Sequence, residues 1–290
     1  MTAIPTTKQS ATSKSFIKRG RAERGVTVTQ HPPIMERIAV VLVRPGGDAN
    51  VGQTARAMKN FGLRRLLLVN PQYTETELCK QYATSAYDIV ERAERFDDLE
   101  QALAGFHYVI GTTRRIGKFR ERFCTSRALA DWLLPQLAGD RRAAIVFGNE
   151  TSGLSKPELD LCNQLVEIAT DPGHRSLNLA QAVVILAYEL FSRAADVSPQ
   201  IDKHHPASHD QLQRLYEHMR RIYLEVGFID RHNPERNMRV LRRLYSRAAP
   251  SLREARILHG ILADTEWYIN HVCKTGERDG YREMAGDGES

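Results

Sequence analysis

Hydrophobic residues gather in short continuous runs from residue 37 onward, and polar stretches containing glycine separate the runs. The runs are rich in β-branched residues, which is typical of strands buried on both faces of a sheet. They lie at 38–43, 66–70, 107–111, 143–148 and 165–169. Stretches with helical spacing alternate with them, at 76–95, 98–104, 126–137 and 156–163. This alternation predicts an α/β domain over 37–194 with a mostly parallel sheet.

Two further helices are predicted inside this domain. The first covers 54–62, where Thr54 can cap the helix and Gly62 can end it. The second, 176–194, is apolar over most of its circumference, so it can pack on the sheet, on a second subunit or on both. Ser176 is well placed as its N-cap, which would put Asn178 two residues into the helix.

The chain after residue 194 has a different pattern. Residues 195–209 are polar and interrupted by proline, which indicates a linker. Strand-like alternation is absent beyond them, and helical spacing predicts a small all-helical domain over 210–275. Its helices are expected at 210–227, 234–247 and 251–271. We expect a flexible tail over 276–290.

Composition and charge narrow the class of protein. The net charge is +6, and +5 of it lies in residues 1–33, within the segment 1–36, where Lys and Arg are frequent and large apolar residues are rare. This segment is predicted to be a disordered basic tail, and its composition also suits an organellar transit peptide. The four cysteines form no C-x-x-C pair, which argues against zinc and disulfides and for a cytoplasmic protein.

No membrane span or metal site is expected. No apolar run approaches the roughly 18 residues that a membrane-spanning helix needs, and no export signal is visible. His174, His204, His205 and His232 have no carboxylate or cysteine at ligand spacing, so the sequence requires no metal.

The glycine-rich loop after the first run, "GGDANVGQT" (46–54), nearly matches the P-loop pattern. Gln53 stands where a P-loop has its lysine, which opposes an ATPase. A tight turn would account for the first two glycines. It does not account for Asn50 or for Arg56, whose guanidinium is expected near the carboxyl end of the strand, where a phosphate could bind.

A second loop, "FGNETSGL" (147–154), repeats the spacing of two glycines around polar residues. Gly148 and Gly153 suggest backbone amides that surround a ligand. The simpler alternative is an ordinary turn with polar side chains, in which Glu150 is exposed to solvent. Ligands bind beyond the carboxyl ends of strands in open parallel sheets. We therefore expect these loops to meet "GTTRR" (111–115) and "TDPGHRSLN" (170–178) in space.

Two basic clusters could contact nucleic acid. One combines Arg114, Arg115, Lys118 and Arg120 with two phenylalanines, and the other places Arg239, Arg242 and Arg243 on one side of a predicted helix. Basic residues bind phosphates and aromatic rings stack on bases. A charged surface loop is the alternative for the first cluster.

Three of these loops together resemble the signature of the SPOUT (TrmH-type) RNA ribose methyltransferases. The matching stretches are "NVGQTARAMKNFG" (50–62), "FGNETSGL" and "SLNLAQAVVILAYE" (176–189). Residues 233–262 resemble the C-terminal extension of the TrmJ group, which are tRNA 2′-O-methyltransferases of this superfamily. The resemblance implies an α/β fold with a deep C-terminal trefoil knot, S-adenosylmethionine as cofactor, and a homodimer formed through the knotted region.

The resemblance also implies roles for individual residues. Cofactor contacts are expected from Thr112, Thr113, Arg114, Gly148, Ile168, Ser176 and Leu177. The catalytic site is expected to use Asn50, Arg56, Glu150, Ser176 and Asn178. Arginine is always protonated and is a poor base, so Arg56 is expected to clamp a phosphate and stabilise the developing alkoxide.

The implied substrate is the ribose at position 32 in the anticodon loop of tRNA. The second motif, with Thr151 and Ser152 after "GNE", is closer to the wider TrmH group than to TrmJ. Ribosomal RNA or another tRNA position therefore stays open as the target. Two alternatives belong to a different class. A catalytically inactive RNA-binding module is opposed by the presence of Asn50, Arg56 and Asn178. A nucleotide-binding protein is opposed by the missing P-loop lysine.

Overall fold

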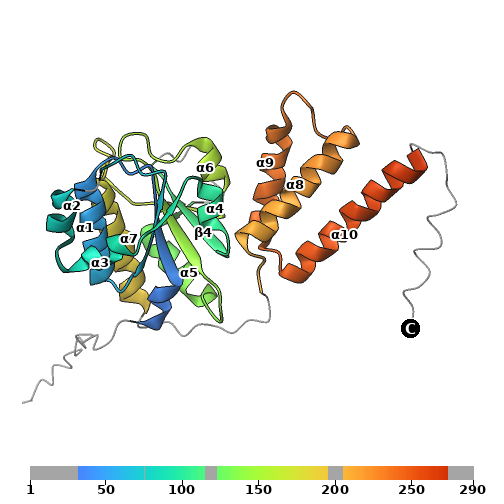
Figure 1. Cartoon of the computed structure of the whole chain (residues 1–290). Coiled ribbons are helices and arrows are strands. Elements are labelled where there is room, and N and C mark those ends of the chain that lie inside the picture. Colours follow the sequence, from blue (N-terminus) through green and yellow to red (C-terminus); the bar gives the residue numbers. More distant parts are fainter. Residues whose placement is uncertain (1–31, 75, 115–122, 195–204, 274–290) are drawn as a thin grey trace, which may run out of the picture. The chain divides into compact units, whose positions relative to one another are not determined.

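The computed structural model describes residues 32–74, 76–114, 123–194 and 205–273. These residues form a seven-stranded sheet with the order β3-β2-β1-β6-β4-β7-β5, and every strand pair in it is parallel. Figure 1 shows the sheet between helices on its two sides. The strands are β1 (Ile38–Val43), β2 (Arg65–Val69), β3 (Glu94–Phe96), β4 (Tyr108–Thr112), β5 (Phe123–Thr125), β6 (Ala143–Phe147) and β7 (Gln164–Glu167). The predicted α/β fold with a mostly parallel sheet is confirmed.

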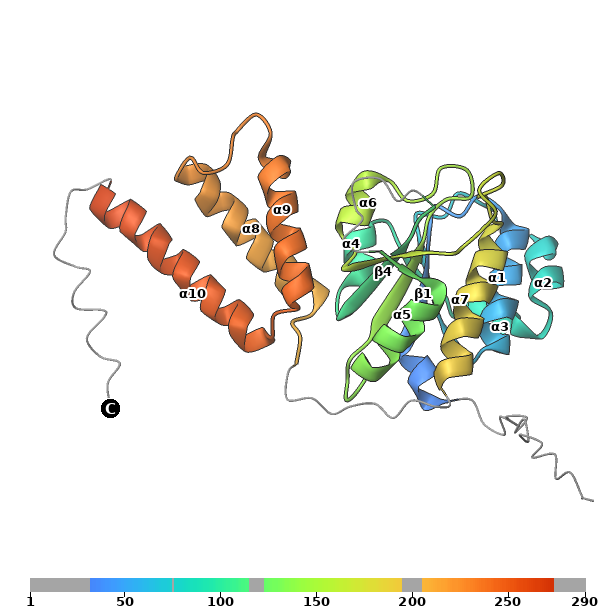
Figure 2. The ribbon, with the colours of Figure 1, turned by 180° about the vertical axis from the view of Figure 1, so that it is seen from behind.

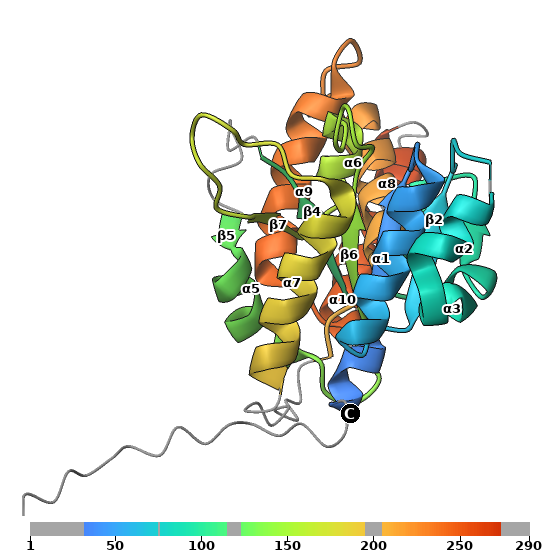
Figure 3. The ribbon, with the colours of Figure 1, turned by 90° about the vertical axis from the view of Figure 1, so that its left-hand side faces the viewer.

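Helices cover both faces of this sheet. They are α1 (Asp48–Asn60), α2 (Glu77–Ala83), α3 (Tyr87–Glu91), α4 (Leu99–Leu103), α5 (Ser126–Leu133), α6 (Lys156–Asp160) and α7 (Leu179–Ala194). Alternate residues of β1 face opposite sides, so Val40 packs in the core beneath α1, α5 and α7, and Val41 packs beneath α4 and α6. Figures 2 and 3 show α7 beside α1 on the first of these faces.

Two edge regions differ from the prediction. The expected helix over 76–95 is instead α2, a 3-10 turn at Thr84–Ala86, and α3, followed by strand β3. Thr84 has a positive φ of 51°, which breaks the helix there. Strands β3 and β5 were not predicted because each has only three residues, none of them buried, and therefore no apolar run.

Helix α1 begins at Asp48, six residues before the predicted start, so the assignment of Thr54 as its cap is wrong. Thr54 is instead fully buried in the middle of the helix. Gly52 explains the difference, because a Cβ at this position would lie 2.3 Å from the carbonyl oxygen of Cys79 in α2. The glycine thus permits a close helix contact that outweighs its poor helix propensity. The helix ends before Gly62, as predicted.

Helix α7 begins at Leu179, so Ser176 is not its N-cap and Asn178 is not inside the helix. Asn178 occupies the cap position itself. Its Oδ1 accepts hydrogen bonds from the backbone amides of Ala180 at 2.9 Å and Gln181 at 3.4 Å. This bonding satisfies two amides that the first turn of a helix leaves free.

The ordered fold begins before residue 37. Pro33–Arg37 form a 3-10 helix in which Ile34 and Met35 are buried in the core. The prediction of a disordered tail over 1–36 is therefore wrong for residues 33–36. Residues 1–31 lie outside the described residues, as do 195–204 and 274–290.

The C-terminal region is helical, as predicted, with α8 (His209–Glu225), α9 (Pro234–Ala248) and α10 (Leu252–Tyr268). It has a hydrophobic core of its own, which includes Leu215, Ile222, Met238 and Leu262. Ser208 caps α8 through a capping box with Gln211, so the predicted linker extends one residue too far. No helix among the described residues is long and apolar enough to cross a membrane.

Candidate active site

The site lies at the carboxyl edge of the sheet. Strands β1, β6, β4 and β7 are consecutive neighbours and parallel, so the segments that follow them leave the sheet at the same edge. These segments contain the glycine-rich loop, the second loop, "GTTR" and the approach to α7. The predicted convergence of loops that are distant in the sequence follows from this strand order.

A cavity of about 390 Å³ opens among these loops. All the residues predicted to contact a cofactor line it, namely Thr112, Thr113, Arg114, Gly148, Ile168, Ser176 and Leu177. The volume lies within the range of roughly 300–1,000 Å³ that is usual for small-molecule pockets. That these residues bind a cofactor remains a prediction, but the structure brings them together around one space.

The wall of the cavity is tightly folded backbone at Gly148. A Cβ there would lie 2.2 Å from the backbone carbon of Gly153 and from the backbone nitrogen of Leu154. Only glycine leaves room for this approach. Gly153 has a positive φ of 69°, which also favours glycine. The two glycines noticed in the sequence therefore shape the loop that lines the cavity.

A chain of hydrogen bonds connects the three motifs. The Nδ2 atom of Asn178 donates to Oδ1 of Asn50 at 2.9 Å, and Nδ2 of Asn50 donates to Oε1 of Glu150 at 2.9 Å. Glu150 also accepts from the backbone amides of Gly46 at 2.9 Å and Gly47 at 3.3 Å. Because Oδ1 of Asn178 caps α7, its Nδ2 must face Asn50, which fixes the direction of the whole chain.

Arg56 lies outside this chain of hydrogen bonds. It follows Asn50 by six residues on α1, which places it about 9 Å along the helix and about 120° around it. Its side chain is exposed, and the described part of the protein offers its guanidinium no hydrogen bond or ion pair. Of the predicted catalytic residues, the structure joins Asn50, Glu150 and Asn178, places Ser176 at the cavity, and leaves Arg56 on the open surface.

The predicted RNA-binding residues are in different environments. Arg114 is exposed at the cavity, and Arg115, Lys118 and Arg120 fall outside the described residues. On α9, Arg239, Arg242 and Arg243 are all half-buried. Arg242 pairs with Glu235 at 3.7 Å and lies over the ring of Tyr216, 5.7 Å from its centroid, so it is engaged within the helical region.

Sequence reasoning missed several residues of this region. Lys156 and Arg175 line the cavity, and Arg44 and Glu158 form an ion pair beside it. Lys156 and Arg175 could have been noticed, because both lie in segments that follow strands at the same edge. The pairing of Arg44 with Glu158 has no signal in the sequence. Among the described residues no group of three His, Cys, Asp or Glu side chains is placed to hold a metal ion.

Comparison with known proteins agrees with this geometry. The SpoU rRNA Methylase family matches residues 37–188, and the C-terminal domain of the tRNA methyltransferase TrmJ matches residues 210–277. The tRNA (cytidine/uridine/adenosine-2′-O-)-methyltransferase TrmJ of Pseudomonas aeruginosa is 38% identical, covering 80% of this chain and 95% of its own length. The tRNA (cytidine/uridine-2′-O-)-methyltransferase TrmJ of Salmonella typhimurium is 37% identical, over 80% of this chain and 98% of its own.

Solved structures show the same likeness. The crystal structure of TrmJ from Z. mobilis superposes with a TM-score of 0.70 at 29% identity, covering 79% of this chain and 98% of that one. A methylase family protein from Neisseria gonorrhoeae gives a TM-score of 0.60 at 33% identity, over 66% of this chain and 97% of its own. The chain therefore belongs to the SpoU methylase family and continues, beyond it, into the C-terminal domain of TrmJ-type proteins.

Proposed function

We propose that this protein methylates the 2′-oxygen of a ribose in tRNA, at the pyrimidine of position 32 in the anticodon loop, with S-adenosylmethionine as the methyl donor. The observation that carries the proposal is the hydrogen-bonded chain Asn178–Asn50–Glu150, which joins all three motifs at the edge where the cavity opens. The similarity to tRNA 2′-O-methyltransferases over both domains supports tRNA as the substrate.

The cavity fits such a cofactor. Its lining combines hydroxyl groups, from Thr112, Thr113 and Ser176, with apolar side chains, from Ile168 and Leu177. This mixture suits a ligand that carries both a polar amino-acid end and a nucleoside. When bound, S-adenosylmethionine would supply the sulfonium methyl group that is transferred.

The protein's own residues hold the loops around the cavity and position the substrate. The attacking ribose oxygen must approach the methyl group in line, so catalysis depends largely on how rigidly the surrounding loops are held. Glu150 holds the amides of Gly46 and Gly47 and the side chain of Asn50, which fixes the glycine-rich loop. Ser176 lines the cavity, and its hydroxyl is proposed to orient the substrate ribose.

Arg56 is proposed to stabilise the developing alkoxide and to bind the neighbouring phosphate. Since it faces away from Asn50 on α1, we propose that a homodimer completes the site, with Arg56 of a second copy facing the cavity. Exposed apolar residues on α7 support this assembly: Val184 is 41% exposed and Tyr188 is 57% exposed. The trefoil knot of the family and a cytoplasmic location belong to the same proposal.

Methylation of ribosomal RNA is the second candidate. It is favoured by the second motif, in which Asn149, Thr151 and Ser152 are closer to the wider TrmH group. The full chain would be incubated with labelled S-adenosylmethionine and either total tRNA or ribosomal RNA. Incorporation into tRNA alone supports the proposal, and incorporation into ribosomal RNA alone would replace it with the second candidate.

A further inference from the structure

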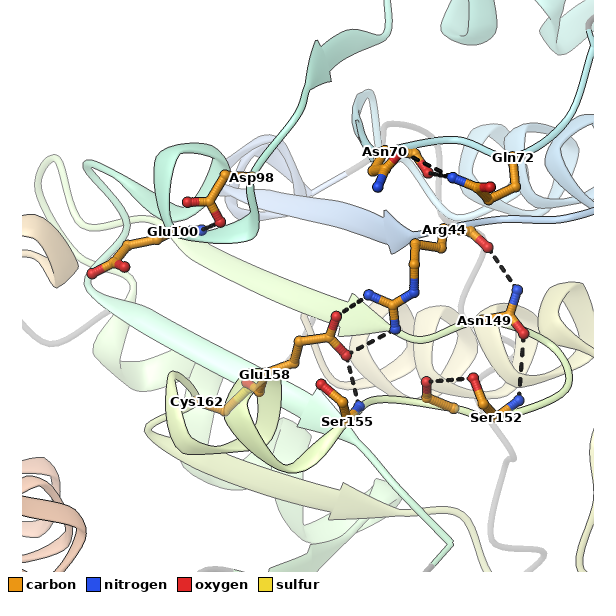
Figure 4. Close-up of polar contacts among 11 residues, drawn as sticks. Arg44, Asn70, Gln72, Asp98, Glu100, Asn149, Ser152, Ser155, Glu158 and Cys162 are labelled. Carbon is orange, nitrogen blue, oxygen red and sulfur yellow. Dashed lines mark hydrogen bonds and ion pairs between the residues drawn. The ribbon is translucent and has the colours of Figure 1, made fainter. Parts of the chain in front are cut away.

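Arg44 follows the last residue of β1 and has an unusual backbone conformation. Its φ is +50°, which is rare for a residue with a side chain. Both of its backbone polar groups are engaged. The amide donates to the carbonyl of Val69 at 2.8 Å. The carbonyl accepts from Nδ2 of Asn149 at 2.8 Å (Figure 4). A strained conformation persists only where its surroundings hold it, and such sites concentrate near functional loops.

The side chain of Arg44 forms a two-pronged ion pair with Glu158 in α6 (Figure 4). One guanidinium nitrogen donates to Oε2 of Glu158 at 3.1 Å, and the other contacts Oε1. The same Oε2 accepts the backbone amide of Ser155 at 2.6 Å. The Glu158 side chain is only 12% exposed. This burial raises its pKa, but the hydrogen bonds from Arg44 and Ser155 outweigh the burial, so the net pKa lies below the ordinary value.

These contacts reach both ends of one loop. Asn149 stands at its start, where its Oδ1 accepts the amides of Thr151 at 3.0 Å and Ser152 at 3.3 Å. Ser155 stands at its end. The intervening residues 150–154 all line the cavity. Arg44 therefore holds the start of the loop directly, because its backbone carbonyl binds Asn149. It holds the end indirectly, because its guanidinium binds Glu158, which accepts the amide of Ser155.

We infer that Arg44 is a positioning residue that fixes the 149–155 loop as the wall of the cofactor cavity, acting through Asn149 and the Glu158 ion pair. Neither Arg44 nor Glu158 lines the cavity, so the effect on a ligand is indirect. The inference rests on the proposed function, because it takes S-adenosylmethionine as the cavity's ligand.

The same sheet contains a matched control. Arg65 pairs with Glu94 in a similar two-pronged manner, at 2.7 and 3.1 Å, between the starts of β2 and β3. Both partners are more exposed there than Glu158, with 35% and 44% of their side chains accessible. Arg65 and Glu94 lie at the amino ends of their strands, away from the edge where the cavity opens.

The test measures binding of S-adenosylhomocysteine to the full chain by calorimetry, together with the KM for S-adenosylmethionine and kcat. The variants are Arg44→Met, Arg44→Lys, Glu158→Gln, the double variant Arg44→Met/Glu158→Gln, and the control Arg65→Met. Arg44→Met is expected to raise the Kd about tenfold, the effect of losing one hydrogen bond to a charged group. The KM should rise by a similar factor. The double variant should be no worse than Arg44→Met, because glutamine can still accept the amide of Ser155 and both substitutions remove the same ion pair.

The proposal also requires that Arg44→Lys retain part of the affinity and that Arg65→Met leave the Kd unchanged. An unchanged Kd in folded Arg44→Met, or an equal loss in Arg65→Met, would overturn the positioning role. If Arg44→Met does not fold, the Kd for S-adenosylhomocysteine is measured on Arg44→Lys and Glu158→Gln instead. An unchanged Kd in both of these folded variants would overturn the positioning role. Failure of the unmodified protein to bind S-adenosylhomocysteine would instead contradict the proposed function, so the two failures are distinguishable.

Discussion

Asn178 donates a hydrogen bond of 2.9 Å to Asn50, although 128 residues separate them in the sequence. This contact ties the N-terminus of α7 to the first turn of α1. Asn178 has two functions at once, because its oxygen caps the helix and its nitrogen bonds to Asn50. The two functions can be separated by mutation.

Asn178→Ser should keep the cap of α7 and lose the bond to Asn50, because serine caps helices well but cannot donate over the same distance. We expect near-normal thermal stability and a fall in methyl transfer of roughly a hundredfold, typical of a misplaced reacting group. Asn178→Ala should lose the cap as well, which costs about 1 kcal/mol of stability. Normal transfer by Asn178→Ser would show that the contact with Asn50 is not needed.

Arg56→Ala should abolish methyl transfer and largely spare binding of S-adenosylhomocysteine, because Arg56 is exposed and does not line the cavity. If a second copy supplies Arg56, mixing Arg56→Ala with an Asn178→Ser variant should restore part of the activity through mixed dimers. Turnover and affinity are measured on the same preparations. Near-normal turnover of Arg56→Ala would refute its catalytic role.

Gly52→Ala should destabilise the fold, since the added Cβ would lie 2.3 Å from the carbonyl of Cys79. Overpacking of this kind typically costs about 1–3 kcal/mol. Gly260→Ala in α10 is the control, because a Cβ there meets nothing within 4 Å. It should stabilise by about 0.5–1 kcal/mol, the ordinary gain of alanine over glycine in a helix. Urea unfolding of both variants measures the difference, and equal midpoints would contradict the close contact of α1 with α2.

Buried His209 should make the protein less stable in mild acid. Burial lowers its pKa from 6.5 to about 4 in the folded state, so below pH 6.5 the unfolded chain binds a proton that the folded chain does not. Stability is therefore lost as the pH falls from about 6.5 towards 4. Between pH 7 and pH 5 this group should cost about 2 kcal/mol.

The free energy of unfolding of the unmodified protein and of each variant is measured by urea unfolding at pH 7 and at pH 5. His209→Gln should show a smaller loss of stability on acidification than the unmodified protein. His174→Gln, at an exposed loop position, should behave like the unmodified protein. An identical pH dependence in His209→Gln would contradict the assignment to His209.

The fold was predictable where burial leaves a clear pattern. Strand β1 is buried at every position, and its sequence is an unbroken apolar run. Strands β3 and β5 are short and have no buried residues, so no comparable pattern marks them. The start of α1 was mistaken because Gly52 looks like a loop residue, whereas packing against α2 makes it part of a helix.

The same physical limits apply to the site. The meeting of Asn50, Glu150 and Asn178 was predictable, because parallel strands release their loops at one edge. The position of Arg56 was not, since it depends on where α1 begins. With a start at Asp48, Arg56 lies more than two turns into the helix and faces away from Asn50. The pairing of Arg44 with Glu158 depends on tertiary structure over 114 residues.

The most direct measurement locates the methyl group on the RNA. Undermethylated tRNA would be incubated with the full chain and S-adenosylmethionine, digested, and analysed by mass spectrometry, with Arg56→Ala as the inactive control. The account predicts a single 2′-O-methylated pyrimidine at position 32, which is absent from the control. A methyl group on a base, or no modified tRNA from folded protein that binds S-adenosylhomocysteine, would contradict it.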